Sequence, residues 1–303
     1  NADAMYHIGS IQQIASFTST GGGNQCGDHR ISQNQPPVPD AGNNYIIPAR
    51  TPFELRGQAN DINGDTLVYA WQQLDVGDSS TEDTDKGNNA LFRVHTPTDK
   101  TFRSFPPLPD ILQHTKSKGE TLPEQERSLR FSFTAQDGFN SAQSDEMTIL
   151  VKRTGSRFAL NLPRSQYVLG ETYKIFWNVA NTDLPPVNCS SVDISLSTDG
   201  GKQFNIDLAK NIANNGEAWV TIPVDAAITS QGRFKLKCSD NIFFALSYRD
   251  FVLTGDNTLV ADSYDDEDQP EPELKDVIIE ALAISSNEQS SAGGSFSFLL
   301  FFL

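Results

Sequence analysis

The chain has 303 residues, which is enough for about two domains. Its 39 acidic and 23 basic residues give a net charge of −16, which argues against nucleic acid as a partner because phosphates would repel the protein. The same charge suits a secreted protein, or one that binds hard cations through carboxylates.

Runs rich in Phe, Val, Ile, Thr and Tyr alternate along the sequence with clusters of Asn, Asp, Gly and Pro. Long apolar stretches at helical spacing are not part of this pattern. Short strands separated by turn residues predict an all-β fold made of sandwiches or barrels.

Residues 1–35 form a segment of a different kind. Ile8, Ile11, Ile14 (or Ala15) and Phe17 fall near one face of a helix of about two to three turns. Gly21 and the two glycines after it end this helix. A single short helix cannot bury such a face by itself. We therefore expect this segment to be the terminal helix of an upstream domain whose remainder precedes Asn1.

The Pro-rich segment 36–42 indicates a linker at the start of a first module, which spans residues 36–153. The strands predicted in this module are Tyr45–Ile47, Phe53–Gln58, Leu67–Gln73, Leu91–Val94, Leu129–Ala135 and Glu146–Lys152. Between about 76 and 127 only one weak strand is expected, so this connection is unusually long. Its apolar cluster, Phe102 and Phe105–Leu108, is either a contact surface or a cover for the sandwich edge, and we favour the cover.

A second module is predicted for residues 156–255. Its expected strands are Phe158–Leu162, Thr172–Val179, Ser191–Ser197, Trp219–Ile222, Gly232–Cys238 and Ile242–Leu253, with a hairpin turn at Thr198–Gly201.

Residues 256–303 differ from both modules. Residues 256–280 carry ten acidic side chains against one Lys, which predicts a disordered, self-repelling linker. The apolar run 296–303 is too short to cross a bilayer, which needs about 20 residues. We expect the sequence to be a fragment open at both ends.

Three segments, in this order, resemble reprolysin-like zinc metallopeptidases of marine bacteria. The segment Met5–Ile14 followed by Cys26-Gly27 resembles their last catalytic helix. Residues 36–153 resemble their polycystic-kidney-disease-type, immunoglobulin-like module through Asp40–Gly42, Thr51–Leu55 and Asn60–Trp71. Residues 156–253 resemble their second sandwich through Thr172–Ala180, Asp193–Gly201 and Lys237–Phe244.

The tail has a resemblance of its own. Ser290–Ser295, which contains Gly293 and Gly294, is similar to a glycine-glycine sorting signal that a rhomboid-type membrane protease reads, although the rest of the span and the basic end are missing. Together the resemblances imply two tandem immunoglobulin-like sandwiches from a protein that is secreted or held at the surface of a Gram-negative bacterium. Membrane contact is expected only through this tail.

The catalytic site of such peptidases is not among these residues. A zincin needs two His residues four positions apart on a helix with a Glu between them. His7, His29, His95 and His114 do not have that spacing. We therefore expect this chain to be non-catalytic, with zinc only in the upstream domain.

Cys189 and Cys238 lie 49 positions apart in the second module, and in a secreted sandwich they are expected to form a disulfide. Such a loop closure stabilises a module by about 4 kcal/mol in the chain-entropy model. Cys26 is left over, and its partner is expected upstream.

Asp61, Asn63 and Asp65 offer alternating oxygen ligands over a Gly-containing turn, and Asp137 lies in a second turn. Hard cations bind six to eight oxygens, so these four residues are a candidate calcium site. The alternative is ordinary turn chemistry with solvated side chains.

Three tryptophans bear on binding. Trp71 and Trp177 lie in the middle of predicted strands and are expected in the cores, with a carbohydrate platform as the alternative. Trp219 is left open.

The leading hypothesis is a pair of accessory modules that space the upstream catalytic domain or dock it on extracellular protein or polysaccharide. One alternative is a surface adhesion stalk stiffened by calcium, and another is a carbohydrate-binding module. Sandwich folds serve all three, so the site must decide between them.

Overall fold

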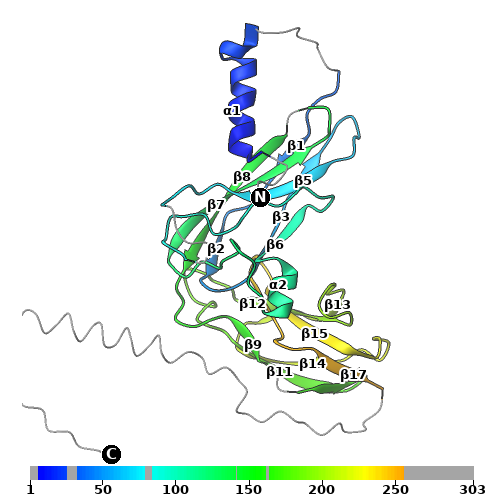
Figure 1. The fold of residues 1–303 in the computed structure, drawn as a ribbon. Helices are drawn as coiled ribbons and strands as arrows, with labels where there is room; N and C mark the ends of the chain where they lie inside the picture. Colours follow the sequence, from blue (N-terminus) through cyan, green and yellow to red (C-terminus); the bar gives the residue numbers. More distant parts are fainter. Residues whose placement is uncertain (1–5, 26–32, 79–83, 141, 162–163, 256–303) are drawn as a thin grey trace, which may run out of the picture. The chain divides into compact units, whose positions relative to one another are not determined.

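The computed structural model describes residues 6–25, 33–78, 84–140, 142–161 and 164–255 (Figure 1). Contacts group Asn1–Asp262 into one compact unit, which contains every described strand and helix. Among the described residues, no helix is both long enough and apolar enough to span a membrane.

The first sandwich is built on a four-stranded sheet in the order β2-β8-β7-β5. These strands are β2 (Tyr45–Pro48), β5 (Val68–Gln73), β7 (Arg127–Gln136) and β8 (Gln143–Lys152). Strand β2 runs parallel to β8, and the other pairs are antiparallel. Two smaller sheets accompany it, β1 (Val38–Asp40) with β4 (Gln58–Asn60) and β3 (Phe53–Arg56) with β6 (Phe102–Phe105).

An aromatic cluster fills the first core. Phe53, Phe92, Phe105 and Phe131 pack with ring centroids 4.9 to 6.1 Å apart. Trp71 is also buried, packs against Phe133 with ring centroids 5.0 Å apart, and donates its indole N–H to the Thr101 carbonyl. The expectation that Trp71 is a core residue is confirmed.

The second sandwich has two sheets. The larger has the order β10-β17-β15-β12-β13, and β16 also pairs with β15. Its strands are β10 (Gln166–Val168), β12 (Ser191–Ser197), β13 (Ile206–Ala213), β15 (Thr229–Cys238), β16 (Phe244–Leu246) and β17 (Phe251–Thr254). The smaller sheet has the order β14-β11-β9, with β9 (Ala159–Asn161), β11 (Thr172–Asn178) and β14 (Glu217–Thr221).

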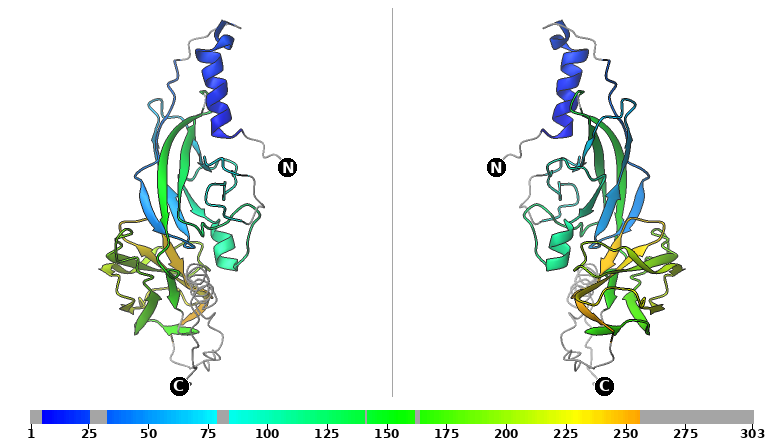
Figure 2. Two further views of the ribbon diagram at one scale, coloured as in Figure 1. Left: turned by 90° about the vertical axis from the view of Figure 1, so that its left-hand side faces the viewer. Right: turned by 90° about the vertical axis from the view of Figure 1, so that its right-hand side faces the viewer.

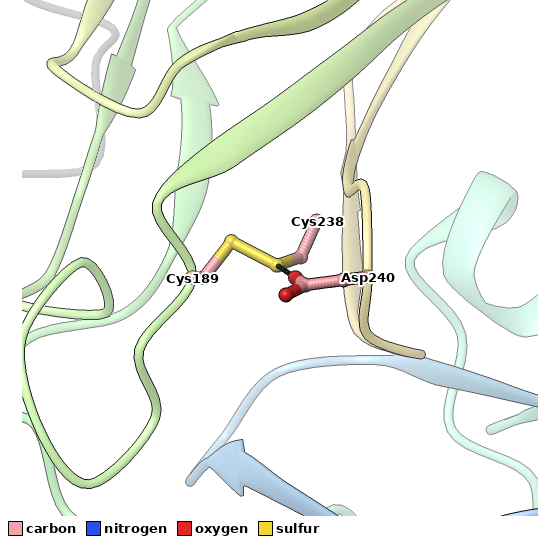
Figure 3. A group of neighbouring side chains, drawn as sticks. All are labelled: Cys189, Cys238 and Asp240. Atoms are coloured by element: carbon pink, nitrogen blue, oxygen red, sulfur yellow. Dashed lines mark hydrogen bonds between the residues drawn. A yellow bond between two sulfur atoms is a disulfide. The ribbon is translucent and has the colours of Figure 1, made fainter.

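Two buried groups anchor the second core. Trp177 is buried, as expected, and its indole N–H donates to the side-chain oxygen of Asn214 at 2.8 Å. Cys189 and Cys238 form the predicted disulfide, with Cα atoms 6.0 Å apart (Figure 3). The two sandwiches confirm the predicted all-β, immunoglobulin-like fold.

The structure corrects several sequence-based expectations. Part of the predicted linker is strand β1, and Leu91–Val94 holds only an isolated bridge between Phe92 and Glu120. The long connection instead contains β6 and the short helix α2 (Leu108–Gln113). A break between β16 and β17 divides the predicted strand Ile242–Leu253. Strands β10 and β13 lie where none was predicted.

The apolar cluster of the long connection divides between the two expectations, because only one of its rings is buried. Phe105 is fully buried in the first core, whereas Phe102 is partly exposed under the Arg56 guanidinium. Strand β6, which carries both rings, pairs with β3.

Helix α1 (Ile8–Ser19) confirms the helix expected near the start of the chain, and Gly22–Gln25 follow as one 3₁₀ turn. Its first residues attach to the first sandwich, because the Ile8 N–H donates to the Gln72 side chain at 2.9 Å and Ile8 is buried. Gln12 also contacts Ser144 in β8, and Figure 2 shows α1 meeting the sheet there. Ile14 and Phe17 are exposed, so a partner for this face stays a prediction.

The two sandwiches share hydrogen bonds. The Glu54 N–H donates to the Ile242 carbonyl at 3.0 Å, and the Phe244 N–H donates to the Pro52 carbonyl at 2.9 Å. Phe53 and Phe243 form a bridge between these bonds, and both are fully buried. Strand β3 therefore continues its pairing into the second sandwich.

Candidate metal centre

Three carboxylates converge at one end of the first sandwich. Asp61, Asp65 and Asp137 each offer an oxygen, and these oxygens lie within 4.8 Å of one another. The first two come from the turn after β4, and the third follows β7. The sequence placed these residues in two separate turns, and the fold brings the turns together.

Local turn chemistry shapes the first half of the site. Asp61 Oδ1 accepts the backbone N–H groups of Asn63 and Asp65 at 2.9 and 3.0 Å, which curls the loop around its carboxylate. Gly64 supplies the positive φ of 77° that the turn requires. The other oxygen, Asp61 Oδ2, is buried and has no hydrogen-bond partner among the described residues. A buried carboxylate oxygen without a partner is costly unless a ligand or ion satisfies it.

Asp137 closes the site from the second turn, where it is buried. Its Oδ1 accepts the N–H groups of Phe139 and Asn140 at 2.9 and 2.8 Å, and its Oδ2 accepts the Asn140 side-chain amide at 2.7 Å. Burial by itself would raise the pKa of Asp137, but these hydrogen bonds hold the pKa below its ordinary value. The carboxylate therefore stays charged, as a metal ligand must be.

The amide groups around the carboxylates differ from the predicted set. Asn63 Oδ1 accepts a hydrogen bond from the Gln35 N–H at 2.8 Å, so this oxygen binds the segment that precedes β1. Asn34 donates to Asp65 Oδ2, and Asn140 donates to Asn34 Oδ1 at 2.6 Å. Sequence reasoning missed Asn34 and Asn140, because neither belongs to the alternating Asp-Asn-Asp pattern.

The donor set fits a hard cation. Calcium binds oxygens at about 2.3–2.6 Å, so two of its ligands can lie up to about 5 Å apart, which the spacing of these carboxylates respects. Among the described residues, no Lys or Arg forms an ion pair with any of the three acids. Three adjacent negative charges repel one another, and a divalent cation would remove that cost.

A second group of potential ligands, Cys189, Cys238 and Asp240, has different chemistry (Figure 3). Both sulfurs are used in the disulfide, so the group has no thiolate to offer. We assign it a structural role.

The histidines have separate positions. His7 precedes α1 and lies 3.2 Å from the Gln73 carbonyl, whereas His114 stacks on Tyr248 with centroids 3.9 Å apart. His95 pairs with the buried Glu120, which also binds Arg103. His29, Cys26, Gly293 and Gly294 lie outside the described residues, so the predictions made for them remain predictions.

Comparison with known proteins gives fold-level likeness only. No family model and no curated protein matches the chain. The SGBP-B protein of a Bacteroides ovatus mixed-linkage glucan utilization locus, solved with a mixed-linkage heptasaccharide, is 12% identical, with a TM-score of 0.20. The match covers 73% of this chain and 48% of that one, so the chain spans about half of its length.

Tandem immunoglobulin modules are also similar. The Ig1-2 module of the Drosophila receptor protein tyrosine phosphatase DLAR is 12% identical over 72% of this chain and 98% of that one, with a TM-score of 0.37. The insect immune protein hemolin is 12% identical over 75% and 48%, with a TM-score of 0.22. These similarities concern the fold alone and assign no function to the chain.

Proposed function

We propose that this chain is the non-catalytic accessory region of a secreted zinc metallopeptidase, and that Asp61, Asp65 and Asp137 hold a calcium ion in its first sandwich. The observation that carries the calcium site is the convergence of three carboxylates around the buried, partnerless Asp61 Oδ2. The ion would balance their charge and complete their coordination with further oxygens.

The position of the site suggests what calcium does. Asn34 and Gln35, which lie between α1 and β1, hydrogen-bond to Asp65 and Asn63 in the same turn. A bound ion would stiffen that turn, and with it the chain that leads from α1 into the sandwich. Calcium therefore sets the spacing between the first module and whatever α1 packs against.

The metallopeptidase parent rests on the sequence resemblance of the helix and both modules, in their order. Zinc would belong to the upstream domain, and Gly293-Gly294 would direct sorting to the surface of a Gram-negative cell. The gene tests this part of the proposal. A reading frame before Asn1 that encodes no His-Glu-x-x-His segment would overturn the metallopeptidase assignment, and sandwich repeats found there instead would favour an adhesion stalk.

Thermal unfolding tests the calcium site. After a chelator wash of the full chain, millimolar Ca²⁺ should raise the melting temperature, because an ion that binds only the folded state stabilises it by about 2.7 kcal/mol at 100 times its Kd. The double variant Asp61→Asn/Asp65→Asn should lose this rise. Asp225→Asn, which removes one exposed acid from the second module, should retain it.

Each outcome is informative. An equal rise in the wild type and the double variant would place calcium elsewhere, and no rise in either would leave residues 61–65 as an ordinary turn. A rise that Mg²⁺ reproduces fully would indicate general charge screening rather than a calcium-sized site.

A further inference from the structure

The outer face of the sheet β14-β11-β9 carries an exposed aromatic pair. On β11, Tyr173, Ile175 and Trp177 point inward, which leaves Lys174 and Phe176 on the outer face. The register places Lys174 opposite Trp219 and Phe176 opposite Glu217. Trp219 is 68% exposed and Phe176 is 37% exposed, so both rings present apolar surface to solvent.

The side chain of Lys174 lies near both rings. The Lys174 ammonium lies 5.7 Å from the Trp219 ring centroid and 5.4 Å from that of Phe176. The same ammonium pairs with Glu217 at 2.8 Å. Single exposed apolar residues are common on protein surfaces, whereas here two exposed rings on adjacent strands share one neighbouring cation, and we call Trp219 and Phe176 the platform.

A polar hollow adjoins the platform at the end of β11. It has a volume of about 480 Å³, and its polar lining includes Ser156, Asn178, Asn181, Asp183 and Asn215. Asn178 follows Phe176 on the same face, and the hollow also reaches Gly216, which precedes β14. Side-chain amides both donate and accept hydrogen bonds, so this lining suits a partner rich in hydroxyl groups.

The net charge of the outward side chains on this face indicates which class of partner it binds. The outward positions of β11 and β14 carry one cation and one anion, Lys174 and Glu217, and these are paired with each other. These outward positions are therefore neutral overall, and the adjoining hollow adds one carboxylate, Asp183, in a chain with a net charge of −16. A surface with so little net charge gives no strong attraction to a polyanion or a polycation, whereas an uncharged partner needs none.

We propose that the outer face of β14-β11-β9 binds an uncharged polysaccharide, with Trp219 and Phe176 stacking on sugar faces and the Asn-rich hollow binding hydroxyl groups. Sugar rings combine an apolar C–H face with hydroxyls at their edges. The rings lie on adjacent strands and the hollow begins at the end of β11, so one chain of sugars would reach both. This site is independent of both the calcium site and the metallopeptidase parent.

The test is affinity electrophoresis of the full chain through gels that contain one neutral polysaccharide each: hydroxyethylcellulose, mixed-linkage barley glucan, laminarin, or galactomannan. At least one should retard the wild type, and Trp219→Ala should weaken that binding by about tenfold or more, which corresponds to about 1.4 kcal/mol. Trp219→Phe should restore part of it. Phe139→Ala, which removes an equally exposed ring from the first module, should bind as the wild type does.

Fluorescence adds a readout that is specific to the site. Trp71 and Trp177 are buried, so acrylamide quenching in the folded protein reports mainly on Trp219. The polysaccharide that retards the chain should protect this fluorescence. Migration unaffected by all four polysaccharides, or equal retardation of the wild type and Trp219→Ala, would overturn the proposal. Loss of self-association in Trp219→Ala without any glycan effect would also overturn it, because the face would then bind a second copy of the chain.

Discussion

At the scale of single residues, a buried ion pair fixes the long connection of the first sandwich. Arg127 Nη1 lies 2.7 Å from Asp85 Oδ1, and both side chains are at most 1% exposed. The Asp85 carboxylate also accepts the N–H groups of Gly87, Glu124 and Gln125. These bonds tie the connection to β7 from within.

The surroundings of Asp85 make the stability of the fold depend on pH. Burial would raise the pKa of Asp85, but the hydrogen bonds from Gln125, Gly87, Glu124 and Arg127 hold it below its ordinary value. A carboxyl group with a depressed folded-state pKa stabilises the fold at pH values above its unfolded pKa of about 3.9. That contribution is lost as the pH falls through the folded-state pKa.

Replacement of Asp85 tests this pair. Asp85→Asn should lower the free energy of unfolding at pH 7 by about 3 kcal/mol, because the buried Arg127 charge loses its partner. As the pH falls from about 5 to about 2, the range in which carboxylates titrate, the free energy of unfolding should decrease less in the variant than in the wild type. Urea unfolding at several pH values measures both effects. Asp99→Asn, at an exposed position of the same connection, should change neither.

At the scale of elements, the sequence predicted strands best where apolar residues alternate in long runs. β7, β8, β12 and β15 each lie within or around a predicted segment. The sequence did not predict β13, because Asp207, Lys210 and Asn211 interrupt the alternation of apolar and polar residues in this strand. The register of β13 with β12 also shifts at two points. β6 and α2 are short and lie in a long connection without a regular apolar pattern, so pairing with β3 rather than local sequence defines β6.

The candidate metal site was likewise predictable from the sequence only in part. The three acids could be selected from sequence, because their residue types and turn spacing suit a hard cation. Their proximity depends on the pairing of β5 with β7, a contact across about 65 residues of chain, and so do the roles of Asn34 and Asn140. Trp219 likewise could not be assigned to a face until the register of β14 was known.

Helix α2 and the turn after β12 provide a matched pair of substitutions. Gly200 and Gly201 both have positive φ, 77° and 84°. A Cβ at Gly200 would meet open space, whereas one at Gly201 would lie 2.5 Å from Leu112 Cδ2 of α2. Gly200→Ala should therefore cost about 1–2 kcal/mol from backbone strain alone. Gly201→Ala should cost at least about 1 kcal/mol more if α2 packs on this turn, as urea denaturation can measure. Equal costs would show that α2 does not pack there.

At the scale of the whole described molecule, the two sandwiches are joined by more than a linker. Besides the bonds of β3, the Arg233 guanidinium donates to the Leu112 carbonyl at 3.2 Å, and Asn241 donates to the Ile46 carbonyl at 3.0 Å. Such continuity of hydrogen bonds and buried rings predicts that the modules unfold together.

Calorimetry tests this coupling. The wild type should give one transition whose calorimetric and van't Hoff enthalpies agree. Phe243→Ala should cost about 3–5 kcal/mol, because it empties a fully buried position where the modules meet, and it should split the transition into two. Ile228→Ala, at an exposed position, should leave one transition. Two transitions in the wild type would show that the modules fold independently.

The parallel pairing of strands has a mechanical consequence. In the first sandwich β2, near the module's start, runs parallel to β8, its last strand, and in the second β10 runs parallel to β17 in the same way. A tensile load applied through the two ends of either module would pull these neighbours in opposite directions along their length. The force would then load all the hydrogen bonds between the two strands in shear at the same time. It would not break them one after another. We therefore expect each module to resist unfolding by a force applied through its ends.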